Sequence, residues 1–209
     1  MNAMVTIEET FDQGYDHARA MCGARTAKYA VMHSIDANQP EQNHADLSGA
    51  EAITKLRALV TQASTCFFCT GMQTGCAFRT RPMSVQKLDD DGSLWFLSPN
   101  DSEKNADLAR EPVVQLLFQG SEHSDFLSLY GRATVSADKG KIEELWDPIL
   151  KTWFTEGPSD PRISVIHVVP LQGYYWDTKH GRAVAFAKMV VGAVTGKTLD
   201  DSIEGKLSV

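Results

Sequence analysis

The residues best suited to chemistry in this chain are cations and hydroxyls within residues 79–104. Arg81 lies on a predicted strand, and Ser102 and Lys104 open the helix that is expected after the next strand. A guanidinium, an ammonium and the amides of a helix N-terminus are the groups with which proteins hold a phosphate. The segment 93–98 between them is aromatic and apolar, so it could form one wall for a flat ring. The pattern predicts a strand hairpin with an anion-binding site at its ends.

Two of the four cysteines, Cys66 and Cys69, have the C-x-x-C spacing that occurs in metal and redox sites. They fall on a predicted strand, where residues three apart point to opposite faces, so the two thiols would not converge on one metal. Their neighbours are aromatic and apolar, and no second C-x-x-C follows. We therefore expect that these two cysteines, with Cys22 and Cys76, are reduced thiols and that the chain has no metal site.

The bulk composition narrows the class of protein. The 209 residues suggest one domain with appendages. A formal net charge of -7 argues against sequence-independent nucleic-acid binding, because no overall positive field attracts phosphates. The chain has no apolar run of about 18 residues, the minimum for a membrane span, and its first residues do not resemble a signal peptide. We therefore expect a cytoplasmic protein with neither membrane nor nucleic-acid partners.

The elements that must position these groups begin after an N-terminal extension. Residues 1–48 are assigned to this extension, with a helix expected over 11–30 and a polar linker over 37–46. Residues 49–180 are assigned to the main domain, which would carry the binding site.

Helix signals mark both ends of the main domain. Ser48 and Glu51 have the spacing of a capping box at the start of an amphipathic helix. At the other end, residues 181–209 are expected to form a helix over 185–195 and a loose tail over 199–209.

Strands dominate the main domain. Seven short segments, rich in β-branched and aromatic residues and separated by turn signals, are predicted as strands: 65–70, 76–85, 93–98, 113–119, 126–136, 162–169 and 173–177. Only two helices interrupt them, over 102–110 and 139–154. Strands that follow one another at hairpin spacing favour an antiparallel barrel over a doubly wound parallel sheet. The sequence therefore predicts a mainly β (α+β) fold, an antiparallel barrel of six to seven strands with peripheral helices.

Short motifs occur along these elements in a definite order. They are Arg79-Thr80-Arg81-Pro82-Met83, Gly92-Ser93-Leu94-Trp95-Phe96-Leu97-Ser98, Ser102-Glu103-Lys104, Tyr130-Gly131-Arg132-Ala133, Leu145-Trp146-Asp147-Pro148, Lys151-Thr152-Trp153-Phe154, Asp160-Pro161, Tyr175-Trp176-Asp177, Lys188-Met189 and Thr195-Gly196-Lys197. The ordered set resembles the general stress protein 26 family, which belongs to the FMN-binding split-barrel proteins related to pyridoxamine 5′-phosphate oxidase. The resemblance covers about residues 50–205.

This resemblance implies a split barrel that forms a homodimer, with FMN in a cleft between the subunits. Arg81 then matches the arginine under the flavin phosphate and ribityl chain, and Ser102 and Lys104 match the phosphate-binding pair. The full set of cofactor-binding positions that the resemblance implies is Arg81, Pro82, Met83, Ser84, Gln86, Leu97, Ser98, Ser102, Lys104, Trp153 and Trp176. The residue types support a phosphate site independently of the resemblance, because two cations and a helix N-terminus can neutralise a dianionic phosphate.

The chain departs from pyridoxamine 5′-phosphate oxidase itself at the substrate site. Glu103 stands where the oxidase has an arginine, and Gln86 stands where it has a lysine. The oxidase's C-terminal Arg-x-His motif is also absent, so we do not expect this oxidase activity. We expect a flavin-dependent oxidoreductase for a small substrate, with a non-catalytic flavin carrier or stress sensor as the alternative. A split barrel that binds F420 or heme is the third possibility, and no catalytic residue is assigned.

Overall fold

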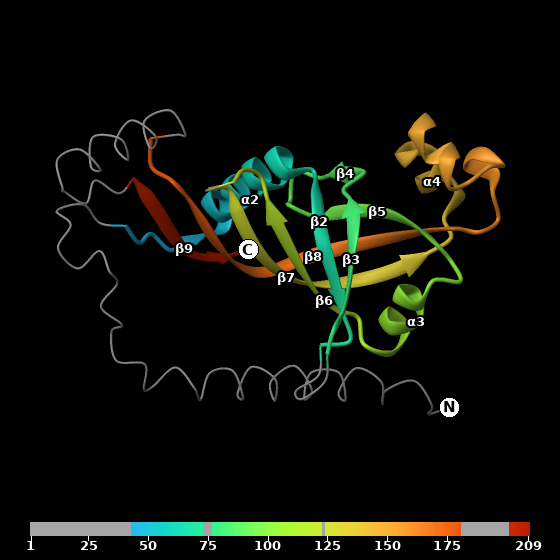
Figure 1. The fold of residues 1–209 in the computed structure, drawn as a ribbon, viewed down its shortest axis with the longest axis horizontal. Helices are drawn as coiled ribbons and strands as arrows, with labels where there is room; N and C mark the ends of the chain where they lie inside the picture. The colour runs from blue at the N-terminus through green and yellow to red at the C-terminus, as the bar shows by residue number, and fades with distance from the viewer. Residues whose placement is uncertain (1–42, 73–76, 123, 181–200) are drawn as a thin grey trace, which may run out of the picture. The chain divides into compact units, whose positions relative to one another are not determined.

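The computed structural model describes residues 43–72, 77–122, 124–180 and 201–209, and these residues form one sheet with helices around it (Figure 1). The sheet has nine strands: β1 (Leu47–Ser48), β2 (Thr65–Thr70), β3 (Arg79–Ser84), β4 (Lys87–Leu88), β5 (Leu94–Pro99), β6 (Val113–Gln119), β7 (Phe126–Ser136), β8 (Ile163–Thr178) and β9 (Ser202–Ser208). The helices are α2 (Gly49–Ala63), α3 (Glu103–Arg110), α4 (Lys139–Leu145) and the 3-10 turns η2 (Pro148–Thr152) and η3 (Gly157–Ser159). The predicted helices over 11–30 and 185–195 lie outside the described residues.

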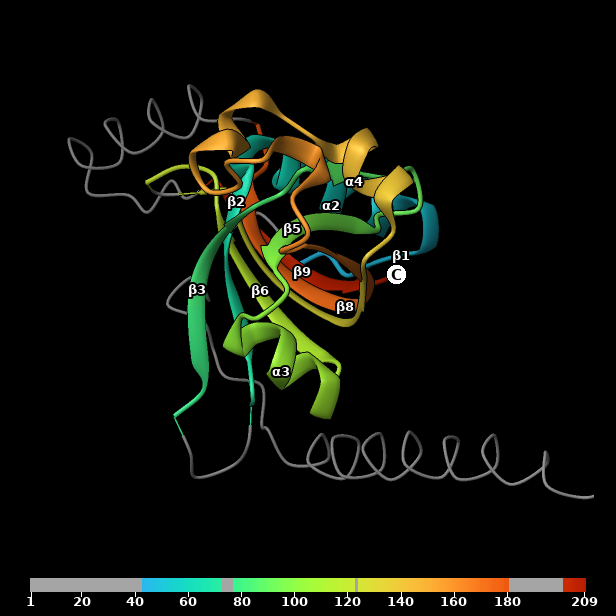
Figure 2. The same cartoon turned by 90° about the vertical axis from the view of Figure 1, so that its right-hand side faces the viewer.

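The strand order is β1-β9-β8-β7-β6-β2-β3, and β5 pairs with β4 and with β8. The first half of β8 pairs with β5 and its second half pairs with β9, while β7 runs along its other side. Figure 2 shows from the side how the sheet curls. Within the described residues every pairing of these strands is antiparallel except that of β1 with β9. The prediction of a mainly β, antiparallel fold with peripheral helices is therefore confirmed.

The core lies between α2 and the curled sheet. α2 buries Ala52, Leu56 and Leu59, which recur at helical spacing, in one cluster with Phe68 and Phe96. The Phe68 and Phe96 rings pack edge to face, with their centroids 5.3 Å apart. Each large apolar side chain that is removed from water here stabilises the fold by about 2 kcal/mol. A second, smaller cluster joins β5 and β8 to α4 and η2.

The predicted hairpin between residues 79 and 98 is wrong in its pairing. β3 pairs with β2 and not with β5, and only the two-residue strand β4 pairs with β5. β3 is the last strand in the order, and an edge strand tolerates Pro82 because no neighbour requires its missing N–H. A turn between β4 and β5 includes Gly92, which takes a positive φ of 87°.

The predicted helix over 139–154 is also wrong, because Pro148 breaks it. α4 ends at Leu145, and Asp147 is extended. A proline disfavours the helical conformation in the residue before it and has no N–H to donate. The Asp147 carboxylate accepts the N–H of Ile149 at 2.9 Å, so it caps the short turn η2 that follows.

The two strands predicted over 162–169 and 173–177 form one continuous strand, β8. Its pairing with β7 shifts register between Tyr130 and Gly131, which pair with Gln172 and Pro170, so Leu171 forms a bulge. Gly131 is required at this point, because a Cβ there would lie 2.7 Å from the carbonyl oxygen of Val169.

The end of the chain is a strand rather than the loose tail that was expected. β9 pairs with β8 over seven residue pairs, and β1 adds to its other side. Leu207 is fully buried in the main core. Gly205 permits this close packing, because a Cβ there would lie 1.9 Å from the carbonyl oxygen of Ala45.

Two smaller points concern the first helix and membranes. The Ser48 side chain makes no capping hydrogen bond, so the predicted capping box does not form. None of the helices in the described residues is long and apolar enough to cross a membrane.

Candidate functional site

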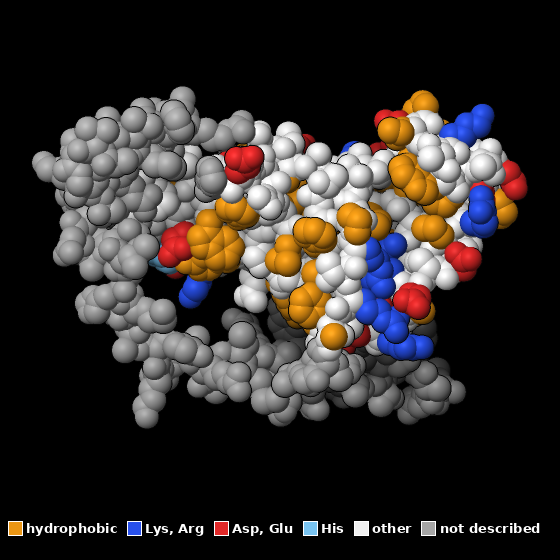
Figure 3. Space-filling model, viewed as in Figure 1, with side chains coloured by type: hydrophobic (Ala, Val, Ile, Leu, Met, Phe, Trp, Pro, Cys, Tyr) orange, Lys and Arg blue, Asp and Glu red, His pale blue; other side chains and the backbone are white. Residues whose placement is uncertain are grey.

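The site begins on the face of β3 that points towards α3. Side chains alternate along a strand, so Arg79, Arg81 and Met83 share one face, opposite Thr70 and Phe68 of β2. Lys and Arg side chains gather beside β3 and α3 (Figure 3).

The guanidinium of Arg81 is held from the β2 side and from the α3 side. Its Nη1 donates to the hydroxyl of Thr70 at 2.8 Å, and its Nη2 lies 3.7 Å from the carboxylate of Asp107. The side chain is mostly buried, with 23% of its surface exposed. Arg81 therefore presents a fixed cation rather than a mobile surface charge.

Lys104 carries the second cation, and it is the least compensated charge of the site. The residue is 4% exposed, and its ammonium donates to Ser98 Oγ at 2.5 Å. In the described part of the chain no carboxylate lies within ion-pair distance of it. Burial, with a smaller effect from the Arg81 charge, lowers the pKa of Lys104 to about 8.

The N-terminus of α3 brings two hydroxyls to the same place. Ser102 is the N-cap of α3, and its Oγ accepts the N–H of Asn105 at 3.3 Å. The Ser102 and Ser98 hydroxyl oxygens are 3.2 Å apart. Ser98, Ser102 and Lys104 thus meet at the positive end of a helix dipole, where negative charge is stabilised.

The structure adds two residues that sequence reasoning missed, Thr70 and Asp107. Asp107 is buried on α3, and it accepts from Thr70 Oγ1 at 2.7 Å and from Arg79 Nη1 at 3.3 Å. Arg79 also lies 3.4 Å from the exposed carboxylate of Glu103. The one available signal was that Asp107 follows Lys104 by three residues, which places both on neighbouring parts of one helix face.

The other predicted positions lie on β3, on β5 or, for Gln86, between β3 and β4. Pro82 and Ser84 face away from Met83, on the exposed side of β3. Gln86 donates from its amide to the carbonyl of Ser84 at 3.3 Å. Leu97 is buried in the second core cluster, next to Ser98.

The two predicted tryptophans lie on other elements. Trp153 follows η2 and is 62% exposed, and Trp176 lies on β8 opposite Phe126 of β7 and Glu204 of β9. Within the described residues of a single chain, the structure brings together Arg81, Ser98, Ser102 and Lys104, and it places Trp153 and Trp176 elsewhere in the fold.

The cysteine spacing does not form a second site. Cys66 and Cys69 are free and buried, as expected, and burial raises the pKa of the Cys66 thiol to about 12. Cys69 accepts instead from the hydroxyl of Thr80 at 3.4 Å. Cys22 and Cys76 lie outside the described residues. No cluster of metal-ligating side chains occurs among the residues that the structure describes.

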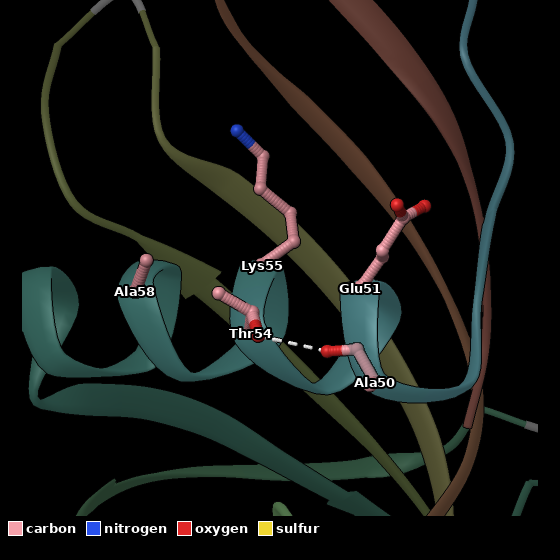
Figure 4. Close-up of a pocket in the computed structure, with 5 residues that line it drawn as sticks. All are labelled: Ala50, Glu51, Thr54, Lys55 and Ala58. Carbon is pink, nitrogen blue, oxygen red and sulfur yellow. Dashed lines mark hydrogen bonds between the residues drawn. The ribbon is translucent and has the colours of Figure 1, made fainter.

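A shallow hollow of about 380 Å³ lies on the outer side of α2. Figure 4 shows the residues that line it: Ala50, Glu51, Thr54, Lys55 and Ala58. The Lys55 ammonium is already paired with Asp177 of β8, and the Thr54 hydroxyl donates to the Ala50 carbonyl at 2.8 Å. All five lining residues belong to α2, so the hollow includes none of the cations described above.

Comparison with known proteins gives consistent matches. Residues 51–200 match the family model described as pyridoxamine 5′-phosphate oxidase like. The chain is 26% identical over 195 residues to Protein bli-3 of Neurospora crassa, covering 88% of each sequence.

Solved structures share the fold. A putative general stress protein 26 from Jannaschia sp. CCS1 is 21% identical, with a TM-score of 0.64 over 77% of this chain and 100% of that chain. A protein related to general stress protein 26 from Clostridium acetobutylicum is 18% identical, with a TM-score of 0.52 over 61% and 89%. These likenesses show that the curled sheet is the split-barrel fold expected from the sequence. The family match confirms the expected relation to pyridoxamine 5′-phosphate oxidase.

Proposed function

This chain belongs to the pyridoxamine 5′-phosphate oxidase-like family, and from that premise we propose that it binds FMN and acts as a flavin-dependent oxidoreductase on a small substrate. The proposal names Arg81, Ser102 and Lys104, with Ser98, as the groups that hold the phosphate. It assigns the ring to the part of the site along β3, β5 and the link between β3 and β4, where Pro82, Met83, Ser84, Gln86 and Leu97 lie.

The buried ammonium of Lys104 is the observation that carries this proposal. A buried charge without a counter-ion costs several kcal/mol, so proteins rarely keep one unless a ligand compensates it. Lys104 is 4% exposed, and within the described residues its one hydrogen bond goes to a neutral hydroxyl. A phosphate dianion at this point would supply the missing negative charge and would accept from Ser98, Ser102 and Arg81 as well. The residues present therefore fit the phosphate of FMN.

The redox chemistry would come from the bound flavin, which exchanges a hydride or electrons with a nicotinamide or another small compound. The chain's own residues would hold and orient the cofactor and would exclude water from the phosphate. We assign no general acid or base. Glu103 lies beside Arg79 at the position where pyridoxamine 5′-phosphate oxidase has a cation, which favours a substrate other than pyridoxamine phosphate.

An absorption spectrum tests the cofactor. The purified protein is mixed with excess FMN, passed through a gel-filtration column and scanned, and the variant with both Arg81→Ala and Lys104→Ala is treated in the same way. We expect flavin bands in the parent and their loss in the double variant. Arg57→Ala with Lys151→Ala is a matched control, because it also removes two positive charges but from a half-buried and an exposed position outside the site. Absence of flavin from the parent would overturn the proposal.

A non-catalytic flavin carrier or stress sensor is the second candidate. Glu103 and Gln86 favour this candidate, because they stand where the related oxidase has the cations of its substrate site. Steady-state oxidation of NADH and NADPH separates the two candidates, since turnover above that of free FMN excludes a pure carrier. A Soret band in the first spectrum would instead indicate heme, and retention of F420 in place of FMN would indicate a deazaflavin protein.

A second copy of the chain is the partner we propose. Phe67 on β2 and Leu117 on β6 are paired in register and are both exposed on the outer face of the sheet. Trp176 and Tyr174 add aromatic surface on β8, with ring centroids 4.7 Å apart. Figure 3 shows apolar side chains spread over this face. Apolar surface of this kind typically marks a protein interface, which supports a homodimer. The cytoplasmic location stays a prediction from the sequence.

A further inference from the structure

Thr70 lies at the point where the sheet and α3 meet, and it contacts both. It is the last residue of β2 and is 0% exposed. Its Oγ1 accepts from Arg81 Nη1 at 2.8 Å and donates to Asp107 Oδ2 at 2.7 Å. A hydroxyl has a single proton, and an ionised carboxylate can only accept, so the Thr70 proton is committed to Asp107. The lone pairs of the hydroxyl are therefore directed at Arg81.

Asp107 is chemically surprising at this place. It is a buried carboxylate close to a group of cations that would attract an anion, and its negative charge should repel a phosphate. Its contacts show what offsets that repulsion. It accepts from Thr70 and from Arg79, and it lies 3.7 Å from Arg81. The two arginines of β3 thus balance its charge, whereas no carboxylate of the described residues lies within ion-pair distance of Lys104.

We infer that Thr70 and Asp107 are positioning residues for a phosphate ligand, and that they act by fixing the guanidinium of Arg81 before the ligand arrives. The inference rests on the proposed FMN site. An arginine side chain loses rotamer freedom when it is held in one geometry, and here the protein imposes that restriction in the absence of ligand. Neither residue needs to touch the ligand, so both are distinct from the phosphate-binding set of Arg81, Ser102 and Lys104.

A comparison of FMN with riboflavin provides the test, because the two ligands differ only in the phosphate. Dissociation constants are measured by quenching of flavin fluorescence for the parent, Thr70→Val and Thr70→Ser. Valine keeps the shape of threonine and removes the hydroxyl, whereas serine keeps the hydroxyl. We expect Thr70→Val to weaken FMN binding by about tenfold or more, as for the loss of a hydrogen bond to a charged group. Riboflavin binding should stay at the parental value, and Thr70→Ser should restore FMN binding.

A control separates positioning from stability. Thr65→Val removes a hydroxyl from the other end of β2, where the side chain donates to the Ala63 carbonyl and, among the described residues, to no other group. This variant should bind both ligands as the parent does. A variant that merely loosens the fold weakens FMN and riboflavin together, so an unchanged ratio of the two affinities in Thr70→Val would overturn the inference.

Asp107→Asn gives a second test, because the two possible roles of Asp107 predict opposite changes in FMN affinity. If Asp107 acted on the ligand through its charge alone, its neutralisation would strengthen FMN binding. If it positions Arg81 through Thr70, the amide breaks the arrangement and FMN binding weakens relative to riboflavin. Stronger FMN binding by Asp107→Asn would overturn the inference, even if Thr70→Val does not fold. If the parent binds neither FMN nor riboflavin, the proposed function itself fails. That outcome differs from one in which the parent binds FMN but Thr70→Val leaves the ratio of the FMN and riboflavin affinities unchanged.

Discussion

The ammonium of Lys104 lies 2.5 Å from the hydroxyl oxygen of Ser98, and this neutral group is its one hydrogen-bond partner within the described residues. This arrangement lowers the stability of the ligand-free protein and favours the binding of an anion. Held at 4% exposure beside Arg81, the charge of Lys104 opposes folding while no ligand is present. The same charge is available to an anion, since no carboxylate in the described part of the chain lies within ion-pair distance of it.

Replacement of Lys104 by methionine should therefore have two opposite effects. Lys104→Met keeps an unbranched side chain of similar length and removes the buried charge, so the ligand-free protein should become more stable by about 1–3 kcal/mol. FMN binding should fall sharply, because the phosphate loses one of the two cations proposed to hold it. Urea denaturation without flavin measures the first effect, and fluorescence titration with FMN measures the second.

Lys55→Met is a matched control, because Lys55 is partly buried and, unlike Lys104, is paired with a carboxylate, that of Asp177. That substitution leaves a carboxylate without its partner and should destabilise the protein, while FMN binding stays parental. If Lys104→Met were instead less stable than the parent without ligand, the ammonium would have an internal partner and would not be reserved for an anion.

The depressed pKa of Lys104 predicts that FMN affinity depends on pH. The phosphate binds the protonated amine, and the ligand-free pKa is about 8, so affinity should fall as the pH rises above 8. Stability of the ligand-free protein should respond in the opposite direction. Between about pH 8 and pH 10.5 the unfolded state holds the proton of Lys104 more strongly than the folded state, so this residue's contribution to stability increases with pH.

Titrations with FMN and with riboflavin from pH 6.5 to pH 9.5 check this dependence. Riboflavin carries the same ring, so any titration of the ring or of the protein as a whole appears in both ligands and cancels in the ratio. Lys104→Met should bind FMN weakly and with no change of this ratio over the range. A parental ratio that is flat through pH 8 would show that Lys104 does not titrate at the phosphate.

Local sequence patterns were enough to predict some strands of this chain but not all of them. The strands over 65–70, 113–119 and 126–136 were predicted with the bounds that they have in the structure, because each is a local run of β-branched and aromatic residues. β9 was missed because Ser202–Ser208 is a strand through its pairing with β8 and β1, and its glycine and charged residues carry no strand signal of their own.

Part of the candidate site could also be predicted from local features of the sequence. Arg81, Ser102 and Lys104 could be selected from residue type and helix position. Thr70 and Asp107 could not, because their contacts depend on the register of β2 with β3 and on where α3 lies against both strands. That information is tertiary and is absent from any single stretch of the sequence.

Leu207 tests whether the terminal strand belongs to the core. It is fully buried and pairs in register with Leu47 of β1 and Gly173 of β8. Leu207→Ala should lower the free energy of unfolding by about 2–4 kcal/mol, through lost burial and the cavity left behind. Denaturant unfolding measures this change, and Lys206→Ala on the exposed side of the same strand should cost less than about 1 kcal/mol. Equal, small effects of the two substitutions would mean that the end of the chain is not packed into the fold.

Phe67 tests the proposed interface between two copies. Its side chain is 56% exposed on β2 and lies beside Leu117, so a charge at this position is tolerated by the single chain but not inside an apolar contact. Phe67→Glu should therefore convert a dimer to a monomer in light scattering after gel filtration, with an unchanged circular dichroism spectrum. Ile149→Glu is the matched control, because Ile149 is similarly exposed but lies on η2. If Ile149→Glu dissociates the dimer and Phe67→Glu does not, the second copy binds the α4–η3 side of the molecule rather than the outer face of the sheet.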